Sequence, residues 1–358
     1  MCNTIQETTP VTPLDPSDAR CNAVKYAILA PSPHNTQPWR VAFQGDERII
    51  LSIDHSRLIP GCDPLGRQAF ISVGAFLENL DLAAKNSGLR ADIDLFPAGW
   101  PDSRLVQDTP VARVDLVEDP HIEPDPLFLQ IPLRHTSRRR FEKRKVPLDA
   151  AGEITAAYDF SLVPLGFSHD DDLIHAIADL AADAMEIELA DPERFRETLQ
   201  YFRFTDAEAH TAQDGFGHAQ SGYGPVMRFF IGRFILPRSK AASSPESFSR
   251  MAKRSTREQA ASAGGIGWLS TKGDHRVDQV RTGRAFQRVH LKACALGLAL
   301  HPMSQLLADY PGMAGLRSVL RDLLGVPDTQ AVQMLFRMGY ARPVLPTPRR
   351  RPGDFFFP

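Results

Sequence analysis

The chain has 358 residues, enough for one large domain or two ordinary ones, and it can bury a core without disulfides or metal. Hydrophobic residues make up 43% and charged residues 23%, a composition that excludes a disordered, collagenous or membrane-spanning chain. The 41 basic and 43 acidic residues leave a net charge of −2, so the charge balance gives no reason to expect nucleic acid or a membrane as a partner.

The cysteines favour a reducing compartment. None of the four forms a C-x-x-C pair, which argues against a zinc ribbon or a thioredoxin-type motif; they are Cys2, Cys21, Cys62 and Cys294. The first residues are polar and contain no apolar leader segment, so we expect a cytoplasmic protein.

The first third of the chain predicts a helix, two strands and a second helix. The first helix begins at Ser17 and ends before Pro31. Alternating apolar residues predict strands over 39–43 and 49–53, and a long amphipathic helix spans Arg67–Asn86. Two shorter alternating runs, at 93–95 and 112–116, predict further strands.

A helical segment at 127–131 leads into a basic cluster, and a domain boundary is expected just before it. One long helix is predicted from Ile174 to about Tyr201. Residues 205–265 are rich in glycine and predict a mobile cover instead of a core element. Two helices, 283–296 and 316–323, and a strand at 332–338 follow, and a proline-rich tail ends the chain. The mixture predicts an α+β fold.

The most informative segment is Ala30–Trp39, with the sequence APSPHNTQPW. Two prolines restrict the backbone, and short amide and hydroxyl side chains surround them. Such a loop could bind the polar edge of a planar heterocycle. An ordinary capped turn, the commoner outcome for such residues, is the alternative.

Two basic clusters, Arg134–Arg138 and Arg349–Arg351, indicate either a local anion site or solvated basic faces. The guanidinium and hydroxyl groups of Arg134–Arg138 are the combination that phosphate binding requires. A solvated face is the commoner fate of a charge run, and the residues alone leave both possibilities open.

Other chemistries lack their motifs. No histidine or cysteine cluster has the spacing of metal ligands, so no metal site is predicted. Gly264–Gly267 is not a G-x-G-x-x-G sequence, and neither a G-x-S-x-G elbow nor a P-loop occurs.

The segment APSPHNTQPW resembles the flavin-contacting loop of the nitroreductase superfamily, and PLRHTSRRRF resembles its phosphate-site signature. The second follows the first by about 100 residues, an order that resembles the Acg-like branch, in which two nitroreductase-like halves are fused and imitate the usual homodimer. Further similar segments are D-P-x-x-R at 63–67, GLALHPMSQ at 297–305 and the ending MGY with PRR.

The resemblance implies an FMN site shared between the halves. The flavin ring would lie against the loop residues Pro31, Ser32, Pro33 and Asn35, with Gln37 in the same loop. The phosphate and the pyrimidine edge would be bound by Arg134, Thr136 and Arg138, flavin N5 would lie near Ser304 and Gln305, and the tail residues closing on the phosphate would be Arg349 and Arg350.

The resemblance also implies a pseudo-dimeric chain with antiparallel or mixed sheets flanked by helices. Its parts would be a tail at 1–16, halves at 17–125 and 126–340, a lid at 205–265 within the second half, and an arm at 341–358. The second half has AAYDF at 156–160 where the loop motif would recur, and the first half lacks the basic signature, so one flavin site per chain is expected.

The implied activity passes electrons from NAD(P)H to flavin and then to a nitroaromatic or quinone-type small molecule by a ping-pong mechanism. No side chain is assigned as catalytic. An FMN-storing protein whose lid prevents turnover is the alternative, and a cofactor-free interaction protein is a third possibility. The chain would be a monomer or a weak homodimer, without nucleic acid or membrane partners.

Overall fold

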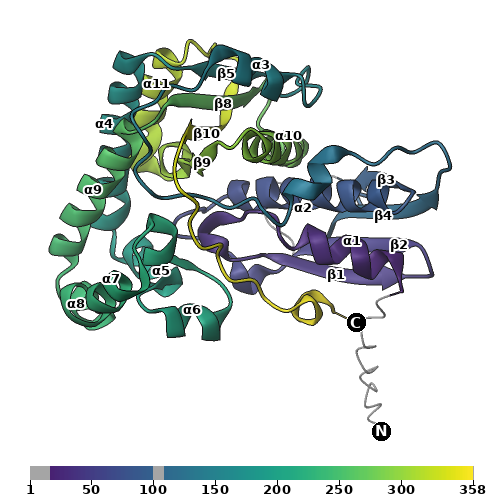
Figure 1. Ribbon diagram of the computed structural model, residues 1–358, viewed down its shortest axis with the longest axis horizontal. Helices are drawn as coiled ribbons and strands as arrows, with labels where there is room; N and C mark the ends of the chain where they lie inside the picture. Colours follow the sequence, from purple (N-terminus) through teal and green to yellow (C-terminus); the bar gives the residue numbers. More distant parts are fainter. Residues whose placement is uncertain (1–16, 100–108, 358) are drawn as a thin grey trace, which may run out of the picture.

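The computed structural model describes residues 17–99 and 109–357, so the expected N-terminal tail at 1–16 lies outside the described residues. Two four-stranded antiparallel sheets, each with its own core, are joined through a pair of long helices (Figure 1). In the described parts of the chain, no helix is long and apolar enough to cross a membrane.

The first sheet has the order β1-β2-β4-β3. Its strands are β1 (Trp39–Gln44), β2 (Arg48–Ile53), β4 (Pro110–Glu118) and β3 (Leu89–Leu95). Val41 lies opposite Leu51 across the first hairpin, and both are fully buried. The core forms where α1 (Ala19–Ala27) and α2 (Arg67–Asn86) pack on this sheet, with the Trp39 ring 5.3 Å from that of Phe76.

The second sheet has the order β5-β8-β10-β9. Its strands are β5 (Leu165–Ser168), β8 (Gly265–Thr271), β10 (Ala331–Gly339) and β9 (Ala299–Pro302). Helices cover both faces, so β10 is buried along most of its length. Leu335 packs in the core of α4, α9 and α11, while Met334 and Phe336 pack with α10 and α3. These helices are α3 (Leu148–Thr155), α4 (Asp171–Ala190), α9 (Pro245–Ala261), α10 (Arg276–Ala295) and α11 (Ala314–Leu323).

Helices α2 and α10 cross at two glycines. A Cβ on Gly74 would lie 1.9 Å from the Val280 carbonyl oxygen, and one on Gly283 would lie 1.9 Å from that of Ile71. The helices therefore approach backbone to backbone. Next to this crossing, the buried Glu78 carboxylate accepts hydrogen bonds from Arg284 (2.8 Å) and Arg288 (3.0 Å).

Several predicted elements differ in the structure. The helix expected over 174–201 is two helices, because α4 ends before Asp191, whose carboxylate caps α5 (Pro192–Tyr201). The helical segment at 127–131 is a 3-10 helix, Pro126–Gln130. The last long helix begins at Arg276 instead of 283, and β5, β8 and β9 were not predicted.

Residues 205–265 are only partly a cover. Their first part holds α6 (Asp206–Ala212), α7 (Pro225–Phe230), a π-helix (Ile231–Ile235) and α8 (Arg238–Ser243), and β7 (Phe216–Gly217) pairs with β6 (Phe202–Arg203). The expectation of no core element is wrong for the last part, because α9 packs along α4 with Phe248 and Ala260 buried, and Gly265 begins the inner strand β8.

The C-terminal arm leaves the second sheet and reaches the outer edge of the first (Figure 1). The Phe357 amide donates to the Val41 carbonyl oxygen at 3.1 Å, and the Phe355 ring is buried 6.1 Å from that of Trp39. These contacts fix the end of the arm against β1.

Candidate functional site

The loop between α1 and β1 has an unusual backbone. Three of its residues that are not glycine have positive φ, namely His34 (46°), Asn35 (55°) and Gln37 (54°). Such conformations cost about 1–3 kcal/mol each and persist only where the surroundings enforce them. Here Pro31 and Pro33 restrict the chain, and the Ser32 hydroxyl accepts a hydrogen bond from the Gln37 amide at 2.9 Å.

Two amide side chains tie this loop to distant segments. Asn35 Nδ2 donates to the carbonyl oxygens of Gly215 (3.1 Å) and Pro348 (2.9 Å). Gln37 Nε2 donates to the Gln213 carbonyl oxygen at 2.9 Å, and Gln37 Oε1 accepts from the Arg350 amide at 2.9 Å. Loop, cover and arm are therefore one hydrogen-bonded unit.

Two guanidinium groups converge on one carbonyl oxygen. The Leu29 oxygen accepts from Arg134 at 2.6 Å and from Arg349 at 3.1 Å, and Arg349 also donates to Asn35 Oδ1. Burial lowers the pKa of Arg134 to about 10, and burial together with the nearby Arg134 charge lowers that of Arg349 to about 9. Both remain protonated at neutral pH.

A third cation, Arg138, lies over the Phe216 ring at 4.1 Å, and burial lowers its pKa to about 10. Among the residues that the structure describes, none of these three arginines is paired with a carboxylate, and the buried Arg134 Nε has no hydrogen-bond partner. Buried charges are normally paired, so this region is suited to an anion.

A further arginine, Arg337 on β10, is fully buried and lies within the electrostatic influence of Arg138. It donates to the Ser137 carbonyl oxygen (3.3 Å), to the Arg139 carbonyl oxygen (2.8 Å) and to His301 Nδ1 (3.1 Å). These bonds hold the basic segment against β9 and β10. Because His301 Nδ1 accepts, its ring proton is on Nε2.

Three histidines near the site are neutral. Burial, with the charge of Arg138, lowers the pKa of His34 to about 4. Burial lowers the pKa of His218 to about 4, and burial followed by the Arg337 charge holds that of His301 well below its ordinary value. The arginines therefore carry the positive charge of the site.

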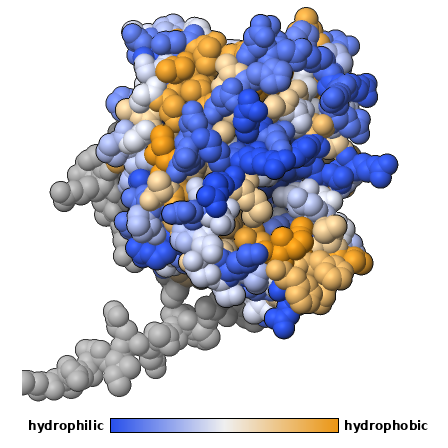
Figure 2. Space-filling view, turned by 90° about the vertical axis from the view of Figure 1, so that its left-hand side faces the viewer, coloured by the Kyte–Doolittle hydropathy of each residue, from blue (hydrophilic) through white to orange (hydrophobic). Residues whose placement is uncertain are grey.

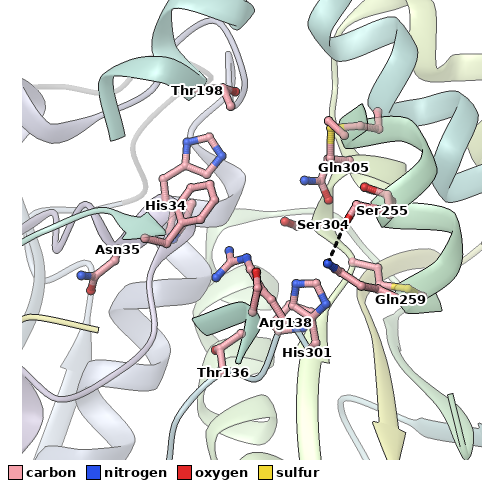
Figure 3. A pocket seen from close by; sticks show the side chains of 18 of the residues that line it. His34, Asn35, Thr136, Arg138, Thr198, Ser255, Gln259, His301, Ser304 and Gln305 are labelled. Atoms are coloured by element: carbon pink, nitrogen blue, oxygen red, sulfur yellow. Dashed lines mark hydrogen bonds between the residues drawn. The ribbon is translucent and has the colours of Figure 1, made fainter. Parts of the chain in front are cut away.

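These groups line one cavity of about 750 Å³. The loop and the Ser304–Gln305 segment lie on opposite sides, with Thr136, Arg138 and His301 between them (Figure 3). One wall of the cavity is apolar. Met185 and Leu189 of α4 and Phe202 of β6 contribute to it, and the cover adds Ile231, Leu236, Phe248 and Met251. Glu188, also lining the cavity, is 3% exposed, and burial raises its pKa to about 7.

Most of the site residues predicted from the sequence line the cavity, and two of them do not. The lining includes Pro31, Ser32, Pro33, Asn35, Arg134, Thr136, Arg138, Ser304, Gln305 and Arg349. Gln37 and Arg350 do not line it, because their hydrogen bonds join the loop to the arm. Sequence reasoning missed His34, Glu188, Phe216, His301 and Arg337. His34 lies inside the loop motif and His301 inside the GLALHPMSQ segment, so both were available, whereas no motif marked Glu188, Phe216 or Arg337.

Metal chemistry finds no support in residues 17–99 and 109–357, where no three His, Cys, Asp or Glu side chains gather as ligands. The cavity is instead a large, partly apolar space with neutral imidazoles and unpaired guanidinium groups. Such a site suits an organic molecule that carries an anionic group.

Comparison with known proteins agrees with this architecture. Residues 133–340, more than half of the chain, match the Nitroreductase family. The chain is 30% identical to the "Probable NAD(P)H nitroreductase PigM" of Serratia sp. (strain ATCC 39006), over 92% of this chain and 90% of that protein. It is 26% identical to the "Putative NAD(P)H nitroreductase acg" of Mycobacterium tuberculosis, over 95% and 96% of the two chains.

A solved structure has the same fold. It is a crystal structure titled as a "putative nitroreductase" from Anabaena variabilis, with a TM-score of 0.50 and 11% identity over 93% of this chain and 91% of that one. The fold is therefore nitroreductase-like, of the α+β class. This chain belongs to the nitroreductase family.

Proposed function

We propose that the chain binds one FMN in the 750 Å³ cavity, with the phosphate between Arg134 and Arg349. The observation that carries this proposal is the convergence of both guanidinium groups on the Leu29 carbonyl oxygen, with no carboxylate partner for either within residues 17–99 and 109–357. A phosphate at this point would neutralise both cations and accept from the unpartnered Arg134 Nε.

The flavin ring would lie between the loop and Ser304–Gln305. Pro31 and Pro33 offer rigid apolar contact, and Arg138 and the Nε2 proton of His301 are donors for the ring's polar edge. A terminal phosphate site and the absence of a dinucleotide motif favour FMN over FAD.

The activity would be that of an NAD(P)H-dependent oxidoreductase. Bound FMN would supply hydride transfer between donor and acceptor. The chain's own residues orient the reactants and exclude water, and no side chain is assigned as an acid or base. Donor and acceptor would occupy the same cavity in turn, in ping-pong order, and the apolar wall suits nitroaromatic or quinone-type acceptors.

The site would occur once per chain, between the halves at 17–125 and 126–340. The loop comes from the first half, and the basic segment and Ser304–Gln305 come from the second. This arrangement needs no second chain, so a monomer or weak homodimer is proposed.

A flavin-storing protein without turnover is the second candidate. It is favoured by the hydrogen bonds of Asn35 to Gly215 and of Gln37 to Gln213, which hold the cover against the loop. A permanently closed cover would admit neither reductant nor acceptor.

The absorption spectrum of the purified protein, followed by flavin extraction and chromatography, tests cofactor binding. FMN as the main species is expected, and FAD would contradict the phosphate assignment. A colourless protein that takes up no FMN would indicate a cofactor-free role. Steady-state oxidation of NAD(P)H with a nitroaromatic or quinone then distinguishes turnover from storage.

A further inference from the structure

A group of large apolar side chains is exposed on α7 and the π-helix that follows it. The exposed fractions are 63% for Phe229, 49% for Phe230 and 61% for Phe234, and the three rings contact one another at 5.8–6.2 Å. Together with Val226, Met227 and Ile235 they form what we call the aromatic patch. Figure 2 shows apolar surface on the side of the molecule where α7 and α8 lie in Figure 1.

The net charge around this patch is positive. Residues 215–245 contain four basic residues and no acidic one. Arg228 is paired with Asp206, and Arg238 with Glu208, both on α6. Arg233 and Lys240 are exposed and make no ion pair within the described residues, so they leave a net positive charge beside the aromatic rings.

Hydrogen bonds and close backbone packing fix the segment that carries the aromatic patch. Arg228 also donates to the Tyr223 carbonyl oxygen at 2.8 Å, and Arg238 donates to the carbonyl oxygens of Leu199 (2.8 Å) and Phe202 (2.9 Å). A Cβ on Gly232 would lie 2.2 Å from the Phe204 carbonyl oxygen, so the π-helix lies directly on the chain beneath it. The aromatic side chains are therefore directed outward by packing on the opposite side.

The patch is continuous with the cavity. Met227 and Ile235 are about half exposed and also line the cavity, and Ile231 between them turns inward. The same short segment thus has one apolar side toward the site and another toward the outside.

We propose that the aromatic patch docks the protein on an anionic lipid bilayer, with the three Phe rings at the level of the headgroups and Arg233 and Lys240 against acidic lipids. Aromatic and aliphatic side chains beside unpaired basic residues are the combination that binds bilayer surfaces, and exposed apolar patches of this kind mark interaction sites. A second copy of the chain is a poorer occupant, because a two-fold contact through this patch would bring Arg233 and Lys240 of both copies together. Docking here would present the cavity to lipid-soluble molecules, but it does not depend on the proposed flavin.

Flotation of the full-length protein with vesicles tests the proposal. Vesicles of phosphatidylcholine with one-third phosphatidylglycerol should bind it, and phosphatidylcholine alone should bind it much more weakly. A triple variant, Phe229→Ser with Phe230→Ser and Phe234→Ser, should lose binding. The matched control is Leu129→Ser with Leu148→Ser and Leu162→Ser, three exposed leucines elsewhere, which should bind as the original protein does.

The charge contribution is tested with Arg233→Gln and Lys240→Gln together. Each removed charge should weaken binding to anionic vesicles about fivefold. Neither Arg233 nor Lys240 belongs to the apolar patch, so this double variant tests binding to the bilayer even if the triple variant misfolds. Unchanged binding of the pair would overturn the choice of an anionic bilayer.

Three outcomes would contradict docking on a bilayer. Protein that floats with neither vesicle, or a triple variant that binds as before, would overturn the proposal. A dimer that the triple variant converts to a monomer, with no vesicle binding, would make the patch a self-association surface instead.

Discussion

Arg134 and Arg349 lie 215 positions apart in the sequence and donate to the same acceptor, the carbonyl oxygen of Leu29. Neither has a carboxylate partner among the described residues, and each charge lies within the other's field. An anionic group bound between the two arginines would relieve that repulsion. The first prediction follows from this expected anion.

Replacing Arg349 with Ala should weaken FMN binding about 10- to 100-fold, because a charge-assisted hydrogen bond contributes about 1.5–3 kcal/mol. Arg134→Ala should act similarly. Fluorescence titration with FMN gives the affinities. The matched control is Arg351→Ala, an exposed neighbour that does not line the cavity. Equal affinities of the Arg349 and Arg351 variants would contradict the phosphate assignment.

Gly74→Ala should destabilise the protein strongly, because its Cβ would overlap the Val280 carbonyl oxygen and separate α2 from α10. Overpacking costs about 1–3 kcal/mol, and a backbone clash belongs at the upper end. Urea unfolding gives the free energies. Gly152→Ala on α3 is the control, since nothing lies within 4 Å of its Cβ, and it should be neutral or stabilising. Similar losses in both variants would disprove the role of the helix crossing.

Glu188 should make stability fall as the pH rises. Its folded pKa of about 7, raised by burial, exceeds the ordinary 4.5, so between these values the native state keeps a proton that the unfolded chain has released. Arg194 partly opposes this shift, while Glu197 adds to it. The loss from pH 5 to pH 8 should be about 2 kcal/mol, at about 1.4 kcal/mol for each pKa unit.

Glu188→Gln should remove that part of the pH dependence and stabilise the protein at pH 8 more than at pH 5. Denaturant unfolding at both pH values provides the comparison. Glu193→Gln, an exposed carboxyl on α5, is the control and should leave the pH profile unchanged. A Glu188 variant with the original pH dependence would show that the buried carboxyl is not its source.

The cover should control access to the cavity. Replacing residues 224–237 with a short Gly/Ser linker removes Met227, Ile231 and Leu236 from the cavity wall but keeps Phe216, which contacts Arg138. Stopped-flow reduction of the flavin by NAD(P)H should become faster, because the wall excludes reactants when closed. FMN affinity should change little. Equal reduction rates before and after shortening would mean that this segment is not a gate.

Local patterns were enough for much of the fold. The alternation at 39–43 and 49–53 corresponds to β1 and β2, and the amphipathic run at 67–86 corresponds to α2. Such patterns can be found in the sequence because the spacing of buried side chains is set by the geometry of a single strand or helix. The α+β class and the family followed from such runs and from motifs of contiguous residues. Asp191–Pro192 also carried a usable signal, since Asp before Pro is a typical helix start.

Tertiary packing decided what no local pattern contains. Gly265 and Gly267 lie in β8 because the rings of Phe167 and Phe336 occupy the space of their missing side chains, so a strand was hidden in a glycine-rich segment. Helix α9 is part of the core only because α4 lies along it.

Some residues of the candidate site could likewise be predicted from local sequence, and others could not. Pro31–Asn35 and Arg134–Arg138 are recognisable as unusual without the structure, because proline restricts the backbone, and amide and guanidinium groups form hydrogen bonds, in any fold. The hydrogen bond that joins Gln37 of the loop to Arg350 of the arm depends on the tertiary structure, as does the placement of His301 and Arg337 in the same cavity as Arg138. Hydrogen bonds and burial between residues hundreds of positions apart depend on how the two sheets pack, and the spacing of residues along the chain does not contain that information.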